Sequence, residues 1–136
     1  LYAHLNLNVD WTYESYKKLF TFNNIEDIVV SIQYIPLEFL QKYSLFIMRD
    51  NIKPIWEDPM HNGQMSYKLT KDAFKHWCEM CYHMICEDLT ESKSDFKNIN
   101  GMSIILKGTS SMVKVWVNKK SNLKVMKHRK YIFQTR

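Results

Sequence analysis

Residues 43–58 read YSLFIMRDNIKPIWED, and the rest of the chain is organised around this stretch. Its first six residues form a hydrophobic run whose length and composition are typical of a β-strand. A charged turn follows, and Pro54 then fixes its own φ and biases Lys53 toward an extended conformation. We therefore expect Trp56 and Glu57 to be presented from a stiff loop.

The pair Trp56 and Glu57 suits a flat, electron-poor ligand with adjacent N–H donors. The ring can stack on the face of the ligand, and the carboxylate can accept two hydrogen bonds from its edge. Guanine has this edge in its N1–H and 2-amino group, and a methyl group on N7 makes the base cationic. We predict a site for such a base. The alternative is a core tryptophan followed by a solvated glutamate, but a core tryptophan is seldom found in a loop between a lysine and two acidic residues.

Three more aromatic residues are candidates for the same site. Trp11 and Tyr13 lie in the polar connection 10–14, and either one could form a second plate opposite Trp56. Each could equally fold back onto the edge of the sheet. Trp116 lies in the middle of a predicted strand, and the residues alone predict that it belongs to the core.

The length of 136 residues predicts a single domain, 1–136, with a real core. Hydrophobic residues make up 46% and charged residues 24%, as in ordinary soluble globular proteins. No apolar run has the length of a membrane span, and no signal peptide is visible. Three cysteines, an odd number, fall within residues 78–86. This argues against a disulfide framework and predicts a reducing compartment, the cytoplasm. We also expect a monomer.

The charge is distributed unevenly along the chain. Up to Asp95 there are 14 acidic and 9 basic residues, whereas the rest contains 10 Lys or Arg and no acidic residue. The basic part also carries strand-like hydrophobic residues, so it is predicted to be folded structure with a positive face suited to phosphates. The alternative is a solvated basic surface that keeps the protein soluble.

The pattern of apolar residues predicts an α+β fold, an antiparallel sheet with helices on one face. A capping box formed by Asn23 and Glu26 should open the first helix, and Pro36 should mark its exit. The expected helices are 24–34 and 71–89, with a loop at 92–100 and a short helix in the basic tail. The expected strands are 1–9, 18–22, 43–48, 65–70, 102–107, 112–118 and 130–134, with a hairpin turn at 108–111.

The second predicted helix carries a Cys-x-x-Cys pair together with His76, His83 and Cys86. These side chains would point in several directions around one helix, and half of them fall on its apolar face. Zinc sites with this spacing normally use a turn and a second ligand pair, so we predict no metal. Phosphate-binding loops and nucleophile motifs are also missing from the sequence, which disfavours an enzyme and gives no reason to expect a cofactor.

Residues 43–46 and 52–58 resemble the central signature of the eukaryotic translation initiation factor 4E family, the mRNA cap-binding proteins. Residues 21–27 are similar to the family's Thr-Phe-x-x-Val-Glu-Asp segment. The resemblance covers roughly residues 11–116. It extends to residue types along the second helix and in the late hairpin, namely Trp77, Glu79, Ile85, Glu87, Gly101 and Trp116.

The resemblance implies a curved antiparallel sheet with helices on its convex face and the cap in a slot on the concave face. By position, Trp56 would stack on 7-methylguanine, Glu57 would accept hydrogen bonds from the guanine edge, and Trp116 would touch the N7-methyl group. Trp11 or Tyr13 would be the opposing plate. Lys107 stands at the position of a triphosphate-binding arginine. Met112 stands where a second phosphate-binding lysine is expected, and Lys114, Lys119 or Arg129 could take its place.

The implied partners are capped mRNA and a scaffold initiation factor with a Tyr-x-x-x-x-Leu-hydrophobic motif. Val29 replaces a helix tryptophan that anchors the scaffold in this family, so cap recognition is expected and scaffold recruitment is left open. A cap-binding repressor or decoy, and a general basic single-stranded RNA binder, are the alternatives to an initiation factor. The residues implied in partner binding are Ile25, Val29, Cys78, Glu79 and Tyr82.

Overall fold

The structure, a computed structural model, describes residues 1–69, 72–107, 110–118 and 132–135, with the backbone alone described at 107 and 132–135. Within these ranges, seven strands form one antiparallel sheet in the order β2-β1-β3-β5-β6-β4-β7. The strands are β1 (Tyr2–Leu5), β2 (Tyr16–Lys18), β3 (Tyr43–Met48), β4 (Gly63–Leu69), β5 (Ile99–Lys107), β6 (Ser110–Val117) and β7 (Ile132–Thr135).

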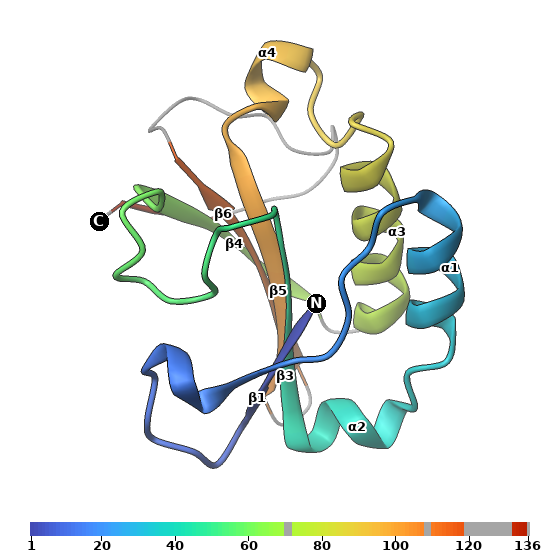
Figure 1. The fold of residues 1–136 in the computed structure, drawn as a ribbon, viewed down its shortest axis with the longest axis vertical. Helices are drawn as coiled ribbons and strands as arrows, with labels where there is room; N and C mark the ends of the chain where they lie inside the picture. The colour runs from blue at the N-terminus through green and yellow to red at the C-terminus, as the bar shows by residue number, and fades with distance from the viewer. Residues whose placement is uncertain (70–71, 108–109, 119–131, 136) are drawn as a thin grey trace.

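The described helices are α1 (Ile25–Gln33), α2 (Leu37–Lys42), α3 (Ala73–Ile85) and α4 (Lys93–Phe96). α1, α2 and α3 lie on one side, whereas the loops that follow β1 and β3 lie on the other (Figure 1). The prediction of an α+β fold with helices on one face is confirmed. None of the described helices is long and apolar enough to cross a membrane.

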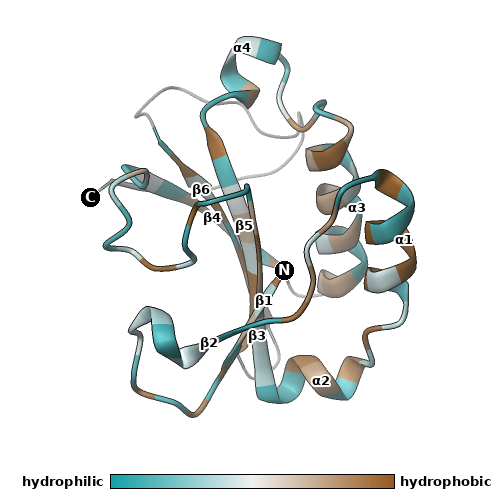
Figure 2. Ribbon diagram, in the orientation of Figure 1, coloured by the Kyte–Doolittle hydropathy of each residue, from teal (hydrophilic) through white to brown (hydrophobic). Residues whose placement is uncertain are grey.

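The core fills the space between the sheet and the helices. Trp77 and Cys81 of α3 are fully buried there, and they share one cluster with alternate residues of the strands, such as Leu45 of β3 and Val113 of β6. The helices carry hydrophobic residues interspersed with hydrophilic ones, as amphipathic helices on a sheet do (Figure 2). The opposite face of the sheet is therefore left for the two loops.

The first two strands differ from the prediction. β1 ends at Leu5 instead of residue 9, because the chain turns toward α2, where the Asn6 N–H donates to the Lys42 carbonyl at 2.8 Å. The second strand covers Tyr16–Lys18 instead of 18–22. The N–H groups of Leu19 and Phe20 both donate to the Leu1 carbonyl, so the chain crosses the end of β1 instead of pairing along it.

The start of α1 was predicted one residue too early. Its N-cap is Asn24, whose side-chain oxygen accepts a hydrogen bond from the Asp27 N–H at 2.8 Å. Glu26 is then the second residue of the helix, so the capping box with Asn23 is wrong. α2 was not predicted. Pro36 is its N-cap rather than only the exit of α1, and a proline is tolerated there because it blocks no helical hydrogen bond.

α3 is shorter than predicted, and α4 lies in the predicted loop. Cys86 is the C-cap of α3, and Glu87 has a φ of 58°, a left-handed conformation that ends the helix. Leu89 lies beyond this helix, although it is buried. The predicted tail helix and residues 108–109 of the hairpin fall outside the described residues, while β7 overlaps the predicted strand 130–134.

Candidate functional site

A cavity of about 430 Å³ lies between the loops that follow β1 and β3. Its floor is the sheet face that the helices leave uncovered. The lining side chains come from both loops, from β2 and from the three central strands β3, β5 and β6. They are Asn6, Trp11, Tyr16, Ser44, Phe46, Trp56, Glu57, Ser103, Ile105, Leu106, Lys114 and Trp116.

The alternation of side chains along each strand decides which residues reach this cavity. On β6, Lys114 and Trp116 line it, whereas Val113 and Val115 point the other way into the core. Successive residues of a strand point to opposite faces, so the two sets cannot mix. The predicted strand pattern thereby brings Trp116 onto the same face as the loops.

Trp11 and Tyr13, the two alternatives for a second plate, have different positions. Trp11 lines the cavity, is 49% exposed, and stacks on the His4 ring with a centroid distance of 4.0 Å and an interplanar angle of 10°. Tyr13 is not among the lining residues. Its ring lies under the Lys53 ammonium at 4.8 Å and meets Tyr2 edge-on at 6.2 Å. Of the two, Trp11 is the residue at the cavity.

Trp56 and Trp116 form one aromatic wall. Their ring centroids are 5.8 Å apart at an angle of 60°, an edge-to-face arrangement. Trp116 is only 6% exposed, and its indole N–H donates to the Ser103 hydroxyl at 3.2 Å. Trp116 is therefore buried, as the residues alone predict, and it also lines the cavity, as contact with a ligand would require.

The two carboxylates after Trp56 have different surroundings. Glu57 is exposed and lines the cavity. Asp58 is 6% exposed, and its oxygens accept hydrogen bonds from the N–H groups of Lys53 at 2.8 Å and Met60 at 2.9 Å. Asp58 is thus occupied in holding the loop closed, so Glu57 is the carboxylate that a ligand could reach.

A buried histidine and a buried asparagine anchor the far end of the same loop. His61 Nε2 lies 2.8 Å from the Lys53 carbonyl, to which it must donate, because a carbonyl only accepts. His61 Nδ1 then accepts from the Asn100 amide at 3.0 Å, and this amide also donates to the Met60 carbonyl at 2.8 Å. Sequence reasoning missed this pair, because 39 residues separate them and neither belongs to a motif.

The predicted phosphate-binding cations are described only in part. Lys114 lines the cavity from β6. The side chain of Lys107, and Lys119 and Arg129 as a whole, fall outside the described residues. Within the described part, the cavity thus combines one carboxylate, Glu57, with one ammonium group, Lys114.

Several polar and aromatic lining residues were not predicted. The Ser44 hydroxyl donates to the Asn6 side-chain oxygen at 2.6 Å, and the Tyr16 ring meets Phe46 edge-on at 5.2 Å. Burial, and to a lesser extent the charge of Glu57, raises the pKa of the Tyr16 phenol, which therefore stays protonated. The alternation within residues 43–48 was the available signal, since it places Ser44 and Phe46 on one face.

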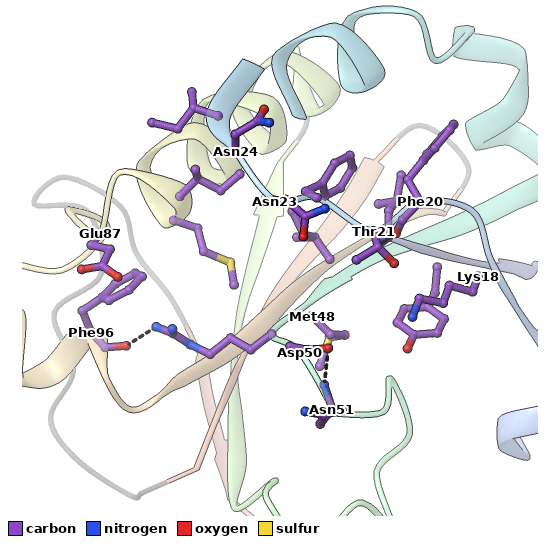
Figure 3. Close-up of a pocket in the computed structure, with 18 residues that line it drawn as sticks. Lys18, Phe20, Thr21, Asn23, Asn24, Met48, Asp50, Asn51, Glu87 and Phe96 are labelled. Atoms are coloured by element: carbon purple, nitrogen blue, oxygen red, sulfur yellow. Dashed lines mark hydrogen bonds between the residues drawn. The ribbon is translucent and has the colours of Figure 1, made fainter. Parts of the chain in front are cut away.

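A second cavity, of about 530 Å³, lies between the segment before α1, the end of β3 and the end of α3. Arg49 anchors its wall, because its guanidinium donates to the Phe96 carbonyl at 3.1 Å and lies 4.6 Å from the Phe96 ring (Figure 3). Of the predicted site residues with described side chains, Ile25 alone lines this cavity. The candidate site is therefore the smaller cavity with the tryptophans.

The two cysteines of α3, Cys78 and Cys81, do not have the lowered pKa that a reactive thiolate needs. Burial raises the pKa of the Cys78 thiol to about 12 and that of Cys81 well above its ordinary value, so both stay protonated near neutral pH. Among the residues that the structure describes, no three His, Cys, Asp or Glu side chains form a group that could hold a metal ion.

The residues implied in partner binding lie on the two helices that cover the sheet. Ile25 and Val29 belong to α1, and Cys78, Glu79 and Tyr82 to α3. Ile25 is 46% exposed, whereas the other four are half-buried. The five positions are thus on the face of the molecule opposite the tryptophan cavity.

Comparison of the sequence with known families gives one match over nearly the whole chain. The model of the family described as eukaryotic initiation factor 4E matches residues 3–135. A protein of Acanthamoeba polyphaga mimivirus, described as a eukaryotic translation initiation factor 4E homolog, is 36% identical over 61 residues. The matching stretch covers 43% of this chain and 22% of the mimivirus protein.

Solved structures with a similar fold include several cap complexes. Schistosome eIF4E in complex with m7GpppG and 4E-BP has a TM-score of 0.75 and 22% identity, covering 89% of this chain and 69% of that one. Ascaris suum eIF4E-3 with m7G cap has a TM-score of 0.73 and 16% identity, covering 89% and 71%. At such identities the likeness shows the fold alone, but the family match spans the cavity and the helices alike. The chain belongs to the eukaryotic initiation factor 4E family.

Proposed function

We propose that this protein binds the 7-methylguanosine 5′ cap of mRNA and acts in translation initiation. The observation that carries the proposal is that four residues from three separate segments, Trp11, Trp56, Glu57 and Trp116, line one cavity. Membership of the initiation factor 4E family and the cap complexes of proteins with a similar fold support the same ligand.

The base would be held between two indole rings. Trp56 and Trp11 come from loops on either side of the cavity, and each would stack on one face of the methylated guanine. Stacking is worth roughly 1–3 kcal/mol per base, and a desolvated cation–π contact about 2 kcal/mol or more. Methylation on N7 should therefore contribute as much as any one side chain, because it supplies the positive charge.

Glu57 would read the guanine edge, and Trp116 would contact the methyl group. The Glu57 carboxylate has two acceptor oxygens for the N1–H and the 2-amino group, and a charge-assisted hydrogen bond is worth about 1.5–3 kcal/mol. Trp116 is fixed by its hydrogen bond to Ser103, so it presents a rigid apolar surface at the floor of the cavity. Discrimination against unmethylated guanine would come from both the charge and this surface.

The triphosphate would extend toward the basic half of the chain. Lys114 lines the cavity on β6, and we assign it to the phosphates together with Lys107, Lys119 and Arg129. Phosphate contacts of this kind release counterions, so binding should weaken as salt increases.

The test is a tryptophan-fluorescence titration with 7-methyl-GTP and, in parallel, with GTP. Strong quenching by the methylated nucleotide alone is expected, because the rings at the cavity should stack on a cationic base. Equal, weak and salt-sensitive responses to both nucleotides would contradict cap binding. They would indicate a general basic single-stranded RNA binder instead.

A specific observation favours a second role, that of a cap-binding repressor. Val29 stands on α1 where the family has the tryptophan that anchors the scaffold factor, and it is half-buried against the core. A repressor would hold the cap without recruiting the scaffold. Titration with a Tyr-x-x-x-x-Leu-hydrophobic peptide separates the roles: micromolar or tighter binding would contradict the repressor, and its absence would contradict the initiation factor.

A further inference from the structure

The two loops on either side of the tryptophan cavity touch each other at a point outside the cavity. Lys53, in the loop after β3, places its ammonium 4.8 Å from the centroid of the Tyr13 ring, in the loop after β1. Neither side chain lines the cavity. Tyr13 follows Trp11 by two residues, and Lys53 precedes Trp56 by three. The contact therefore links the two segments whose indole rings would stack on the base.

The lysine end of this contact is fixed within its own loop. The Lys53 N–H donates to an Asp58 carboxylate oxygen at 2.8 Å, and the Lys53 carbonyl accepts from His61 Nε2 at 2.8 Å. Pro54 follows at once and fixes its own φ. Because Asp58 and His61 lie beyond Trp56 in the sequence, these bonds close the loop around the tryptophan. A shift of Lys53 would therefore carry Trp56 with it.

The tyrosine end is fixed on the opposite loop. Tyr13 begins a 3-10 turn that ends at Ser15, whose N–H and hydroxyl both donate to the Thr12 carbonyl, at 3.0 and 2.7 Å. The Tyr13 ring also meets the ring of Tyr2, a residue of β1, edge-on at 6.2 Å. Burial, and a hydrogen bond with Tyr13, raise the pKa of Tyr2 to about 12, so its phenol stays protonated. The ring that receives the Lys53 ammonium is thus held against the sheet.

We propose that Tyr13 and Lys53 are positioning residues, whose cation–π contact sets the separation of the two loops that carry the stacking indole rings. The slot is then open to the width of a base before the base arrives. The proposal rests on the cap-binding function inferred above and deepens it, since it concerns the same site. Neither residue is expected to contact the ligand, because neither lines the cavity.

The size of the expected effect follows from the exposure of the contact. Lys53 is exposed and Tyr13 is half-buried, and at exposed sites a cation–π contact changes an equilibrium by a factor of about two to five. A base that needs both rings binds only the molecules whose loops are correctly spaced, so the observed affinity scales with their fraction. Without the contact, that fraction and the association rate should fall together. The dissociation rate should change little, because in the complex the base itself holds the two loops.

The experiment is stopped-flow tryptophan fluorescence with m7GpppG on two single variants. Tyr13→Leu removes the ring and changes no charge, whereas Lys53→Met removes the charge and keeps an unbranched apolar side chain. In each variant we expect an association rate about two- to fivefold lower than in the wild type, with a dissociation rate close to the wild-type value. Because Lys53 is exposed, Lys53→Met keeps the test open if Tyr13→Leu does not fold.

Two control variants separate the contact from a general effect of charge. Lys53→Arg keeps a cation over the Tyr13 ring and should retain wild-type kinetics. Lys75→Met removes an exposed lysine of α3, on the other face of the sheet, and should also leave both rates unchanged. An association rate that falls as far in Lys75→Met as in Lys53→Met would mean that net charge, not loop spacing, controls capture, and would contradict the proposal.

A double variant tests whether the two residues act through one contact. Residues that share one interaction give non-additive losses when both are replaced. Tyr13→Leu combined with Lys53→Met should therefore bind m7GpppG no more weakly than the weaker of the two single variants. Losses that add in the double variant would show that the two side chains act separately, which would contradict a shared positioning role.

The remaining outcomes distinguish this inference from the function on which it rests. Wild-type kinetics in both single variants, with m7GpppG still preferred over unmethylated GpppG, would overturn the positioning role and leave cap binding intact. A faster dissociation with an unchanged association rate would mean that the two side chains touch the ligand, and would also overturn it. Failure of the wild-type protein to prefer m7GpppG over GpppG would remove the proposed function, and this inference with it.

Discussion

Glu57 and Asp58 are adjacent carboxylates in different surroundings, and these surroundings decide which one can accept hydrogen bonds from a ligand. Asp58 accepts hydrogen bonds from two backbone N–H groups and is buried. Glu57 remains exposed at the cavity. A buried carboxylate is stable only when its oxygens are satisfied, so Asp58 cannot be withdrawn from the loop without a cost in stability. We therefore expect recognition at this cavity to depend on Glu57.

At the residue scale, Glu57→Ala should weaken binding of 7-methyl-GTP by about 2–3 kcal/mol, because two charge-assisted hydrogen bonds are lost. Isothermal titration calorimetry would measure the loss, and circular dichroism should show an unchanged fold, since Glu57 is exposed. Asp50→Ala is the matched control, an exposed carboxylate that lines the other cavity, and its affinity should stay near the wild-type value. An unchanged affinity in Glu57→Ala would refute the proposed site.

Elements were predictable where local sequence and tertiary packing agree. β3 has the predicted bounds, 43–48, because four of its six residues are buried and the hydrophobic run is unambiguous. Residues 18–22 also contain a short apolar run, yet only Lys18 belongs to a strand, since the backbone after it bonds to Leu1 across the end of β1. That partner is distant in sequence, and local patterns carry no information about it.

In the candidate site, too, features encoded in local sequence were predictable, whereas features that depend on distant contacts were not. The motif around Trp56 and the family resemblance predicted Trp56 and Glu57, which line the cavity from the loop after β3. They did not predict His61 and Asn100, which fix the loop through hydrogen bonds between segments 39 residues apart. They also left Trp11 and Tyr13 undecided, because the direction of a side chain in an irregular connection depends on its neighbours, here His4 and Lys53.

At the element scale, Asn24→Ala should destabilise the protein by about 1 kcal/mol. The substitution removes the N-cap oxygen that accepts from the Asp27 N–H, which leaves a helix N-terminal donor without its partner. The free energy of unfolding in urea measures the effect. Asn23→Ala is the matched control at the exposed neighbouring position and should change stability by less than about 0.5 kcal/mol. The reverse ranking would mean that the helix begins at Asn23 after all.

At the scale of the whole molecule, the two faces of the sheet carry the two sets of candidate residues. The tryptophan cavity, lined by Lys114, lies on one face, and the partner-binding candidates belong to α1 and α3 on the other. The net charge also changes sign along the chain, from an acidic part up to Asp95 to a basic part after it. The basic part contributes β6 to the cavity, and its Lys114 is the described ammonium group there, so we expect an anionic part of the ligand to lie beside it.

We therefore expect Lys114→Ala to lower the salt dependence of 7-methyl-GTP binding. The slope of log affinity against log salt concentration should fall by about 1, since one ammonium–phosphate contact is lost. Titrations at several potassium chloride concentrations would measure it. Lys75→Ala, an exposed lysine on α3, should leave the slope unchanged. If both variants kept the wild-type slope, Lys114 would have no part in holding the phosphates.

The strand order has a consequence for how this protein is made. β3 and β4 follow one another in the chain, but the hairpin of β5 and β6 lies between them in the sheet. During synthesis, β4 therefore has no sheet neighbour until residues 110–117 have emerged, and β3 lacks one of its two. The nascent chain must carry unpaired edges on both β3 and β4 during synthesis, which is when it is most exposed to aggregation. The cavity lacks Trp116 until β6, which pairs with both β5 and β4, has been synthesised. We therefore expect the nascent chain to bind nucleotide only after that point.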